Sequence, residues 1–298
     1  MYSKKYKIGE IPILELGKDC IKDQPAPLLI FYHGWTSSKE IAADFGHILY
    51  KSGYRVIIPD CVNHGERTEE QPRMWEAGKL FNSIMRTADE FPQIAHYFLD
   101  QNLTDFVAVA GVSMGGIITN AILKNHPHVK IAASMMGTPC LCRYAEWVML
   151  EGIENLMEAS TNFYPEISIP DERVIQSILN QEADAIDNLL PDLEKYDLSL
   201  TPEKYNNRFV FYWHAKPDPL VPYTFSADFF ERIKDLPIAK QAKFFGSEKG
   251  SHLVPIKVTK GVRGFFEHYY QIYNETGHAP QEELFWQEIN INKKISIQ

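Results

Sequence analysis

The 298-residue sequence lacks several features that would mark a specialised class of protein. Its 30 Lys and Arg residues are outnumbered by 39 Asp and Glu residues, which gives a net charge of −9, so we expect no nucleic acid partner. No apolar run follows the charged N-terminal residues 1–7, so we expect no signal peptide. The most apolar window, 107–123, is interrupted by glycines and polar residues, so we expect no membrane span.

Cysteine is also scarce, with four residues at Cys20, Cys61, Cys140 and Cys142. None of them is spaced with histidines as zinc ligands are, and the pair Cys140 and Cys142 alone is weak evidence for a metal. We therefore expect reduced thiols, no metal site and a cytoplasmic protein.

What the chain does contain is a hydrophobic content of 45 %, ample for a large core. Apolar runs typical of buried strands alternate with amphipathic helical patterns, which predicts an α/β fold with a mostly parallel sheet and helices on both faces. Edge strands are expected within 6–16, and the other predicted strands are 28–32, 54–60, 105–110, 129–136, 208–214 and 241–245.

Residues 140–207 differ from the rest because strand-like runs disappear there. Helical periodicity replaces them, most clearly over 172–190. We expect a helical cap or lid at 140–207, inserted into a sheet domain made of 1–139 and 208–298. The alternative is one or two ordinary crossover helices, for which about 65 residues would be long.

The stretch Gly111-Val112-Ser113-Met114-Gly115 is the strongest local motif. A Gly-x-Ser-x-Gly between a predicted strand and a predicted helix is typical of a nucleophile elbow, in which a sharp turn exposes the serine hydroxyl. Glycines are needed on both sides because side chains there would clash with the adjacent strand and helix. Ser113 is thus a candidate nucleophile, and the alternative is a buried structural serine in a tight turn.

A serine hydroxyl needs a base, usually histidine, and that histidine needs a carboxylate to orient it. Asp218 follows the predicted strand 208–214 in a proline-flanked loop, and His252 follows the next strand in a glycine-bearing loop. This order of serine, acid and histidine is the order that an elbow enzyme uses. We predict a catalytic triad of Ser113, Asp218 and His252, which needs no cofactor.

Loops at the ends of the other strands supply further candidates. The backbone N–H groups of Trp35 and Met114 are predicted to form the oxyanion hole. The alternative for Trp35 is a core aromatic, and both can hold because the donor is the backbone. Arg67 is expected to pair with nearby acids and fix its loop, and the alternative is that it binds a substrate carboxylate. The residues predicted to line the substrate pocket are His33, Gly34, His64, Arg67, Leu220 and Val221.

Together the motifs His33-Gly34-Trp35, Asp60 with His64-Gly65-Glu66-Arg67, Gly111 to Gly115, Asp218 to Pro222 and Gly250-Ser251-His252 resemble those of the α/β-hydrolase superfamily. The resemblance covers about residues 25–275. Within the superfamily the chain is similar to small cytoplasmic carboxylesterases related to the prolyl-oligopeptidase and acyl-peptidase branch. The sequence shows no sign of the propeller domain that accompanies the oligopeptidases, so the resemblance implies an esterase rather than a peptidase.

The expected function is that of a serine carboxylesterase that cleaves short-to-medium acyl esters through an acyl-serine. An amidase, a thioesterase or a small acyl-peptidase could use the same triad, and a non-catalytic ligand-binding homologue is the alternative from another class. The expected partner is a small-molecule ester. The sequence leaves open whether the chain is a monomer or a homodimer.

Overall fold

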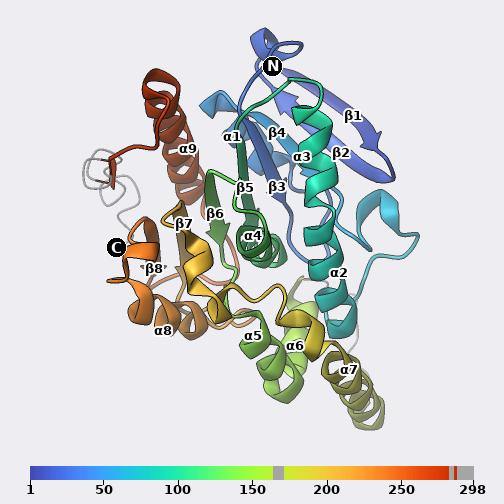
Figure 1. The fold of residues 1–298 in the computed structure, drawn as a ribbon. Coiled ribbons are helices and arrows are strands. Elements are labelled where there is room, and N and C mark those ends of the chain that lie inside the picture. The colour runs from blue at the N-terminus through green and yellow to red at the C-terminus, as the bar shows by residue number, and fades with distance from the viewer. Residues whose placement is uncertain (164–170, 282–284, 287–298) are drawn as a thin grey trace.

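The computed structural model describes residues 1–163, 171–281 and 285–286, with the side chains of 159–163 excepted. Its centre is an eight-stranded sheet in the order β1-β2-β4-β3-β5-β6-β7-β8 (Figure 1). The six strands from β4 to β8 in this order pair in parallel, whereas β2 pairs antiparallel with both β1 and β4. The predicted α/β class with a mostly parallel sheet is confirmed.

The strands agree closely with those predicted from apolar runs, with one difference at the N-terminus. The region around Gly9 and Pro12 forms a hairpin of β1 and β2. Only β1 lies at the edge of the sheet, because β2 also pairs with β4. The strand bounds are β1 Tyr2–Ile8, β2 Ile11–Gly17, β3 Leu28–Tyr32, β4 Arg55–Pro59, β5 Val107–Val112, β6 Ile131–Met135, β7 Phe209–Ala215 and β8 Ala242–Ser247.

Alternate residues of the central strands face two separate hydrophobic clusters, one on each side of the sheet. In β5, Val107 and Val109 belong to the first cluster and Ala108 and Ala110 to the second. The reason is the two-residue period of a strand, which sends successive side chains to opposite faces. Both faces are therefore apolar, as expected for a sheet covered on both sides.

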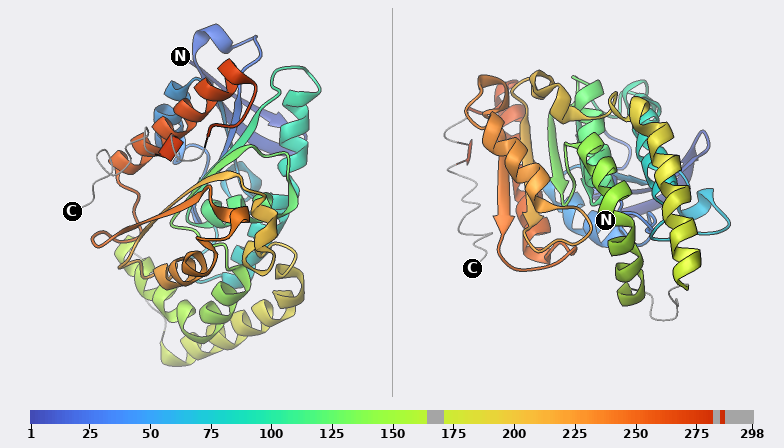
Figure 2. Two further views of the ribbon diagram at one scale, coloured as in Figure 1. Left: turned by 60° about the vertical axis from the view of Figure 1, so that its left-hand side comes forward. Right: turned by 90° about the horizontal axis from the view of Figure 1, so that it is seen from below.

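Helices cover the two faces unequally (Figure 2). The second cluster is covered by α1 Ala43–Leu49 and α9 Ile256–Thr276. The first cluster is covered by α2 Ala77–Asp89, α3 Phe91–Leu99, α4 Met114–Asn125 and α8 Tyr223–Ile233. Short 3₁₀ turns lie at Asp19–Ile21, Tyr50–Ser52, Gly65–Arg67, Leu198–Leu200, Pro202–Tyr205 and Pro237–Ala239.

The described parts of the segment between β6 and β7 contain helices and turns but no strand. Its helices are α5 Leu141–Trp147, a π-helical turn at Val148–Gly152, α6 Ile153–Phe163 and α7 Glu172–Leu193, and two of the 3₁₀ turns follow α7. These helices lie together at one end of the sheet (Figure 1). The part of the segment at 164–170 is outside the described residues. Tyr144 and Leu156 join this segment to the first hydrophobic cluster.

The C-terminal tail returns to the sheet. Phe285 is fully buried, and its ring lies 4.7 Å from that of Phe209 at the start of β7. Trp286 stacks on Phe265 of α9. The tail therefore packs on the sheet and α9 through Phe285 and Trp286. Residues 287–298 are outside the described part of the chain.

Candidate active site

Ser113 lies in the turn between β5 and α4 with φ of 56° and ψ of −122°. This is a strained conformation for a residue with a side chain, and a hydrogen bond from the Ser113 N–H to Met135 O, 2.8 Å, ties the turn to β6. A Cβ added at Gly111 would lie 2.2 Å from Gly115 O, and one at Gly115 would lie 2.0 Å from Tyr32 O. The two glycines of the motif are therefore required by close backbone contacts.

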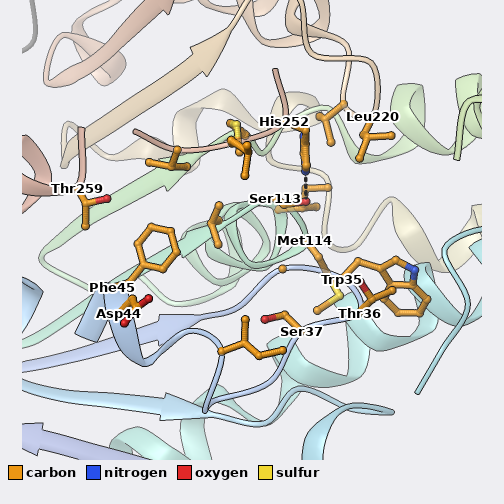
Figure 3. Close-up of a pocket in the computed structure, with 18 of the residues that line it drawn as sticks. Trp35, Thr36, Ser37, Asp44, Phe45, Ser113, Met114, Leu220, His252 and Thr259 are labelled. Atoms are coloured by element: carbon orange, nitrogen blue, oxygen red, sulfur yellow. Dashed lines mark hydrogen bonds between the residues drawn. The ribbon is translucent and has the colours of Figure 1, made fainter. Parts of the chain in front are cut away.

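The hydroxyl of Ser113 meets the imidazole of His252, which arrives from the loop after β8 (Figure 3). Ser113 Oγ lies 2.6 Å from His252 Nε2. His252 Nδ1 lies 2.7 Å and 2.9 Å from the two carboxylate oxygens of Asp218. A carboxylate can only accept, so Nδ1 carries the hydrogen and Nε2 accepts from the serine hydroxyl.

The carboxylate of Asp218, in the loop after β7, accepts hydrogen bonds from four groups. Its Oδ1 accepts the backbone N–H groups of Leu220 and Val221 at 2.9 and 3.1 Å. Its Oδ2 accepts from His252 and also from the buried His214, whose Nε2 lies 3.0 Å away and also donates to Val221 O at 2.9 Å. The carboxylate is thereby fixed in orientation as well as charged.

The electrostatics of Asp218 result from two opposed effects. Burial by itself would raise the pKa of this carboxyl, but the imidazoles of His252 and His214 and their hydrogen bonds outweigh burial and hold the pKa well below its usual range. Sequence reasoning missed His214 as a partner of Asp218. The sequence did contain a signal for this contact, because His214 lies near the end of β7, four residues before Asp218.

Gly34 and Trp35 follow β3 and lie against the nucleophile. A Cβ added at Gly34 would lie 3.5 Å from Ser113 Cβ and 3.9 Å from Ser113 Oγ, so the backbone of this loop closely approaches the serine. Trp35 is nearly buried, and its indole N–H donates to Arg73 O at 3.2 Å. Met114 is the first residue of α4, where backbone N–H groups have no partner within the helix.

The histidines His33 and His64 lie behind this loop and are fully buried. His33 Nε2 accepts the N–H of Cys61 at 3.0 Å while its Nδ1 faces Gly34 O at 2.8 Å. His64 Nε2 accepts the N–H of Thr36 at 3.2 Å while its Nδ1 faces Val62 O at 2.8 Å. Each ring thus has a fixed neutral tautomer.

Burial lowers the pKa of His33 to about 4. Burial, reinforced by the neighbouring His33, lowers the pKa of His64 to about 3. Neither ring lines the cavity over Ser113, contrary to the expectation from sequence. Their ring nitrogens hold the backbone of the loop instead.

Arg67 was also predicted to line the pocket, and it too points elsewhere. Its guanidinium forms a bidentate ion pair with Glu90 at 2.6 and 2.7 Å and donates to Asp60 O at 3.2 Å. It does not line the cavity. The favoured role, pairing with a nearby acid, is the one that the structure supports.

A fully buried ion pair between Lys39 and Asp60 also lies beside this loop, and the sequence did not predict it. Lys39 Nζ lies 2.7 Å from Asp60 Oδ2, and the N–H of Lys39 donates to Asp60 Oδ1 at 2.9 Å. Both side chains are within 1 % of complete burial. This pair fixes the end of the loop 33–38 to the end of β4.

A cavity of about 830 Å³ opens over Ser113 and His252. Three of the residues predicted for the pocket, Gly34, Leu220 and Val221, line it together with Trp35 and Met114. In Figure 3 the Ser113–His252 pair lies between two groups of side chains, with Asp44, Phe45 and Thr259 on one side and Trp35, Thr36 and Leu220 on the other.

Two features that would point to a cofactor or a membrane are absent from the described residues. No group of three or more His, Cys, Asp or Glu side chains in the described ranges is arranged to hold a metal ion. Among the helices that the structure describes, none has the length and apolar character needed to cross a bilayer.

Comparison with known proteins agrees with this architecture. The family model of the alpha/beta hydrolase fold matches residues 27–284. The chain therefore belongs to the α/β-hydrolase family, as its motifs predict.

Two named relatives are esterases. The chain is 31 % identical to the "Putative esterase YitV" of Bacillus subtilis over 266 residues, which cover 88 % of this chain and 96 % of that protein. It is 28 % identical to "Esterase YjfP" of Escherichia coli over 218 residues, 72 % of this chain and 78 % of that protein. With the family match, these relatives identify the chain as an esterase-type α/β hydrolase, a carboxylic ester hydrolase.

A solved structure extends the comparison of the fold. The acylaminoacyl peptidase of Pyrococcus horikoshii is similar with a TM-score of 0.55 and 14 % identity over 95 % of this chain and 42 % of that one. At this identity the likeness concerns the fold. The chain spans less than half of that peptidase.

Proposed function

We propose that the chain is a serine carboxylesterase in which Ser113, His252 and Asp218 form the catalytic triad and that it cleaves short-to-medium acyl esters. The observation that carries the proposal is the hydrogen-bonded line from Ser113 Oγ through His252 to Asp218, with distances of 2.6 and 2.7 Å. Ser113 and His252 line the cavity, and Ser113 lies on a strained turn. These are the nucleophile, base and orienting acid that acyl transfer needs.

In the proposed reaction, Ser113 Oγ attacks the ester carbonyl carbon while His252 Nε2 takes the hydroxyl proton. The carbonyl oxygen becomes an oxyanion, which the backbone N–H groups of Trp35 and Met114 stabilise. The C–O bond to the alcohol then breaks, and the alcohol oxygen takes the proton from His252. Water, deprotonated by His252, cleaves the acyl-serine in the same way and releases the acid.

Asp218 stabilises the imidazolium that forms in both steps. Its low pKa supports this role because the carboxylate stays ionised at neutral pH. His214 acts as a positioning residue for Asp218, since it donates to the carboxylate without reaching the cavity.

The segment 140–207 is proposed to be a cap on the sheet domain of 1–139 and 208–298. Tyr144 and Leu156 support this because they reach from the helical segment into the wall of the cavity. A cap in this position would exclude water and select the substrate. The protein is further proposed to act in the cytoplasm, consistent with its four free cysteines.

The test is hydrolysis of p-nitrophenyl acetate and butyrate by the wild type and by Ser113→Ala. Loss of the nucleophile is expected to lower kcat by about 10⁶, in effect to the background rate. Equal turnover by the two proteins would reject Ser113 as the nucleophile. Labelling of the wild type but not of Ser113→Ala by a fluorophosphonate distinguishes an activated serine from a binding protein, and thioester and anilide analogues with the same acyl group measure the preference for esters.

A further inference from the structure

The cavity over Ser113 extends onto both faces of the sheet. One part, here the inner lobe, is lined by Leu80, Ile117, Tyr144 and Leu156, which belong to the first hydrophobic cluster. The other, the outer lobe, is lined by Ile41, Phe45, Leu253 and Ile256 around the start of α1 and the start of α9. Phe45 packs against the second cluster, so Ser113 at the end of β5 lies where the two lobes meet.

The two lobes differ sharply in exposure. In the inner lobe, Ile117 and Leu156 are 2 % and 3 % exposed. In the outer lobe, Ile41 and Leu253 are each 67 % exposed and Ile256 is 65 % exposed. The inner lobe is therefore a closed end of the cavity, and the outer lobe is its opening to solvent.

The lobes also differ in polarity. The hydroxyl of Tyr144 in the inner lobe is already used, because it donates to Leu220 O at 3.2 Å. The outer lobe adds Asp44, His47 and Lys51 to its exposed aliphatic side chains. An apolar chain suits the inner lobe, whereas a group with both apolar and polar parts suits the outer lobe.

The order of product release decides which part of an ester each lobe holds. The alcohol leaves first, while the acyl group is still bonded to Ser113, and water must then reach the acyl carbon. An alcohol in the closed lobe would be trapped behind the acyl chain. An alcohol in the open lobe can leave directly and is replaced by water.

The position of His252 agrees with this order. The leaving alcohol oxygen must lie within hydrogen-bond distance of His252 Nε2 to take its proton. Leu253 and Val254, which follow the imidazole directly in the chain, line the cavity, so the outer lobe begins beside the proton donor.

We propose that the inner lobe binds an apolar acyl chain and the outer lobe binds a bulky amphipathic alcohol. The site then accepts large groups on the alcohol side of the ester and limits the length of the acyl side. This inference rests on the proposed esterase function. It names Leu156 as a residue that sets acyl length, and Leu253 and Ile256 as residues that recognise the alcohol.

Two substrate series test the assignment by kcat/KM. In the first, p-nitrophenyl esters carry acyl chains of increasing length. In the second, acetate esters carry alcohols of increasing size, from methanol to long aliphatic and aryl alcohols. Leu156→Ala is expected to lengthen the preferred acyl chain by about two carbon atoms, and Leu156→Trp to shorten it, with the alcohol series unchanged.

The double variant Leu253→Ala/Ile256→Ala is expected to lower kcat/KM for acetates of bulky alcohols about tenfold relative to methyl acetate, with the acyl series unchanged. Because both side chains are exposed, this variant keeps its fold even if a change at Leu156 does not. Leu200→Ala is the matched control, since Leu200 is 55 % exposed and does not line the cavity.

The outcomes separate this inference from the proposed function. If the Leu156 variants change the alcohol series, or the outer variants change the acyl series, the assignment of the lobes is overturned. If neither pair of variants changes either series while the wild type hydrolyses both, the lobes do not bind substrate and the inference is overturned. If Ser113→Ala hydrolyses esters as fast as the wild type, the proposed function itself fails.

Discussion

The two loops that meet at Ser113 are held in place by different means. The loop 33–38 after β3 rests on buried groups, which include the fixed rings of His33 and His64 and the ion pair of Lys39 with Asp60. The loop after β8 lies at the surface, and Leu253 beside the imidazole is 67 % exposed. Both ring nitrogens of His252 are engaged by Asp218 and Ser113.

This difference in support separates the two roles proposed for the site, stabilisation of the oxyanion and transfer of the proton. The side proposed to stabilise the oxyanion has several buried supports, so removing one leaves others in place. The side proposed to transfer the proton depends on a single carboxylate, that of Asp218, for the orientation of its base. Substitutions on the two sides should therefore differ in the size of their effect, and this difference can be measured.

Between the two sides of the site, the larger effect is expected on the proton-transfer side, from Asp218→Asn. Asparagine keeps an oxygen to accept the N–H groups of Leu220 and Val221, but its NH₂ group would favour the wrong tautomer of His252 and provide no charge for the imidazolium. We expect kcat for p-nitrophenyl butyrate to fall about 10³–10⁴-fold with little change in KM. A loss below tenfold would show that His252 does not depend on this carboxylate.

A smaller effect is expected on the oxyanion side, from His64→Leu. Leucine cannot accept the N–H of Thr36, so the loop next to Trp35 loses one support. Removing an oxyanion donor outright costs about 10²–10³ in kcat, and a donor that is displaced rather than removed should cost about 10–100-fold.

The matched control is His64→Gln, whose side-chain oxygen can still accept from Thr36. It should retain kcat within a few-fold of the wild type. A loss for His64→Leu as large as that for Asp218→Asn would contradict the contrast between the two loops, and so would equal losses for the Leu and Gln variants.

The same contrast explains what could be predicted from the sequence. The meeting of Ser113, Asp218 and His252 could be predicted because each follows a strand that its apolar run identifies, and because the parallel order brings strand ends to one edge of the sheet. The α/β fold followed from the same alternation. These predictions rest on position along the chain, which a sequence shows directly.

The buried groups that support the loop 33–38 could not be predicted from position along the chain. His33 and His64 lie in the predicted loops but do not face the cavity, because a sequence does not show in which direction a loop side chain points. The pair of Lys39 with Asp60 joins residues 21 positions apart with no pattern between them. The structure was needed wherever a role depends on direction rather than position.

The smallest effect concerns stability in acid and tests whether the buried histidines act as neutral supports. His33 has a pKa of about 4 in the folded protein against about 6.5 in an unfolded chain. Below pH 6.5 the unfolded state therefore binds a proton that the folded state does not, so the stabilisation present above pH 6.5 is lost as pH falls towards 4. From pH 7 to pH 5 this amounts to about 1–2 kcal/mol for His33.

His33→Gln should remove that part of the dependence, because glutamine can donate to Gly34 O and accept from the N–H of Cys61 without titrating. Urea unfolding at pH 7 and pH 5 measures the free energy of unfolding, and the difference between the two pH values should shrink by about 1 kcal/mol in the variant. The same change at the exposed His278 is the control. A pH difference in His33→Gln equal to that of the wild type would mean that this ring is not kept neutral by burial, and the contrast between a fixed oxyanion side and a dependent base side would lose its electrostatic basis.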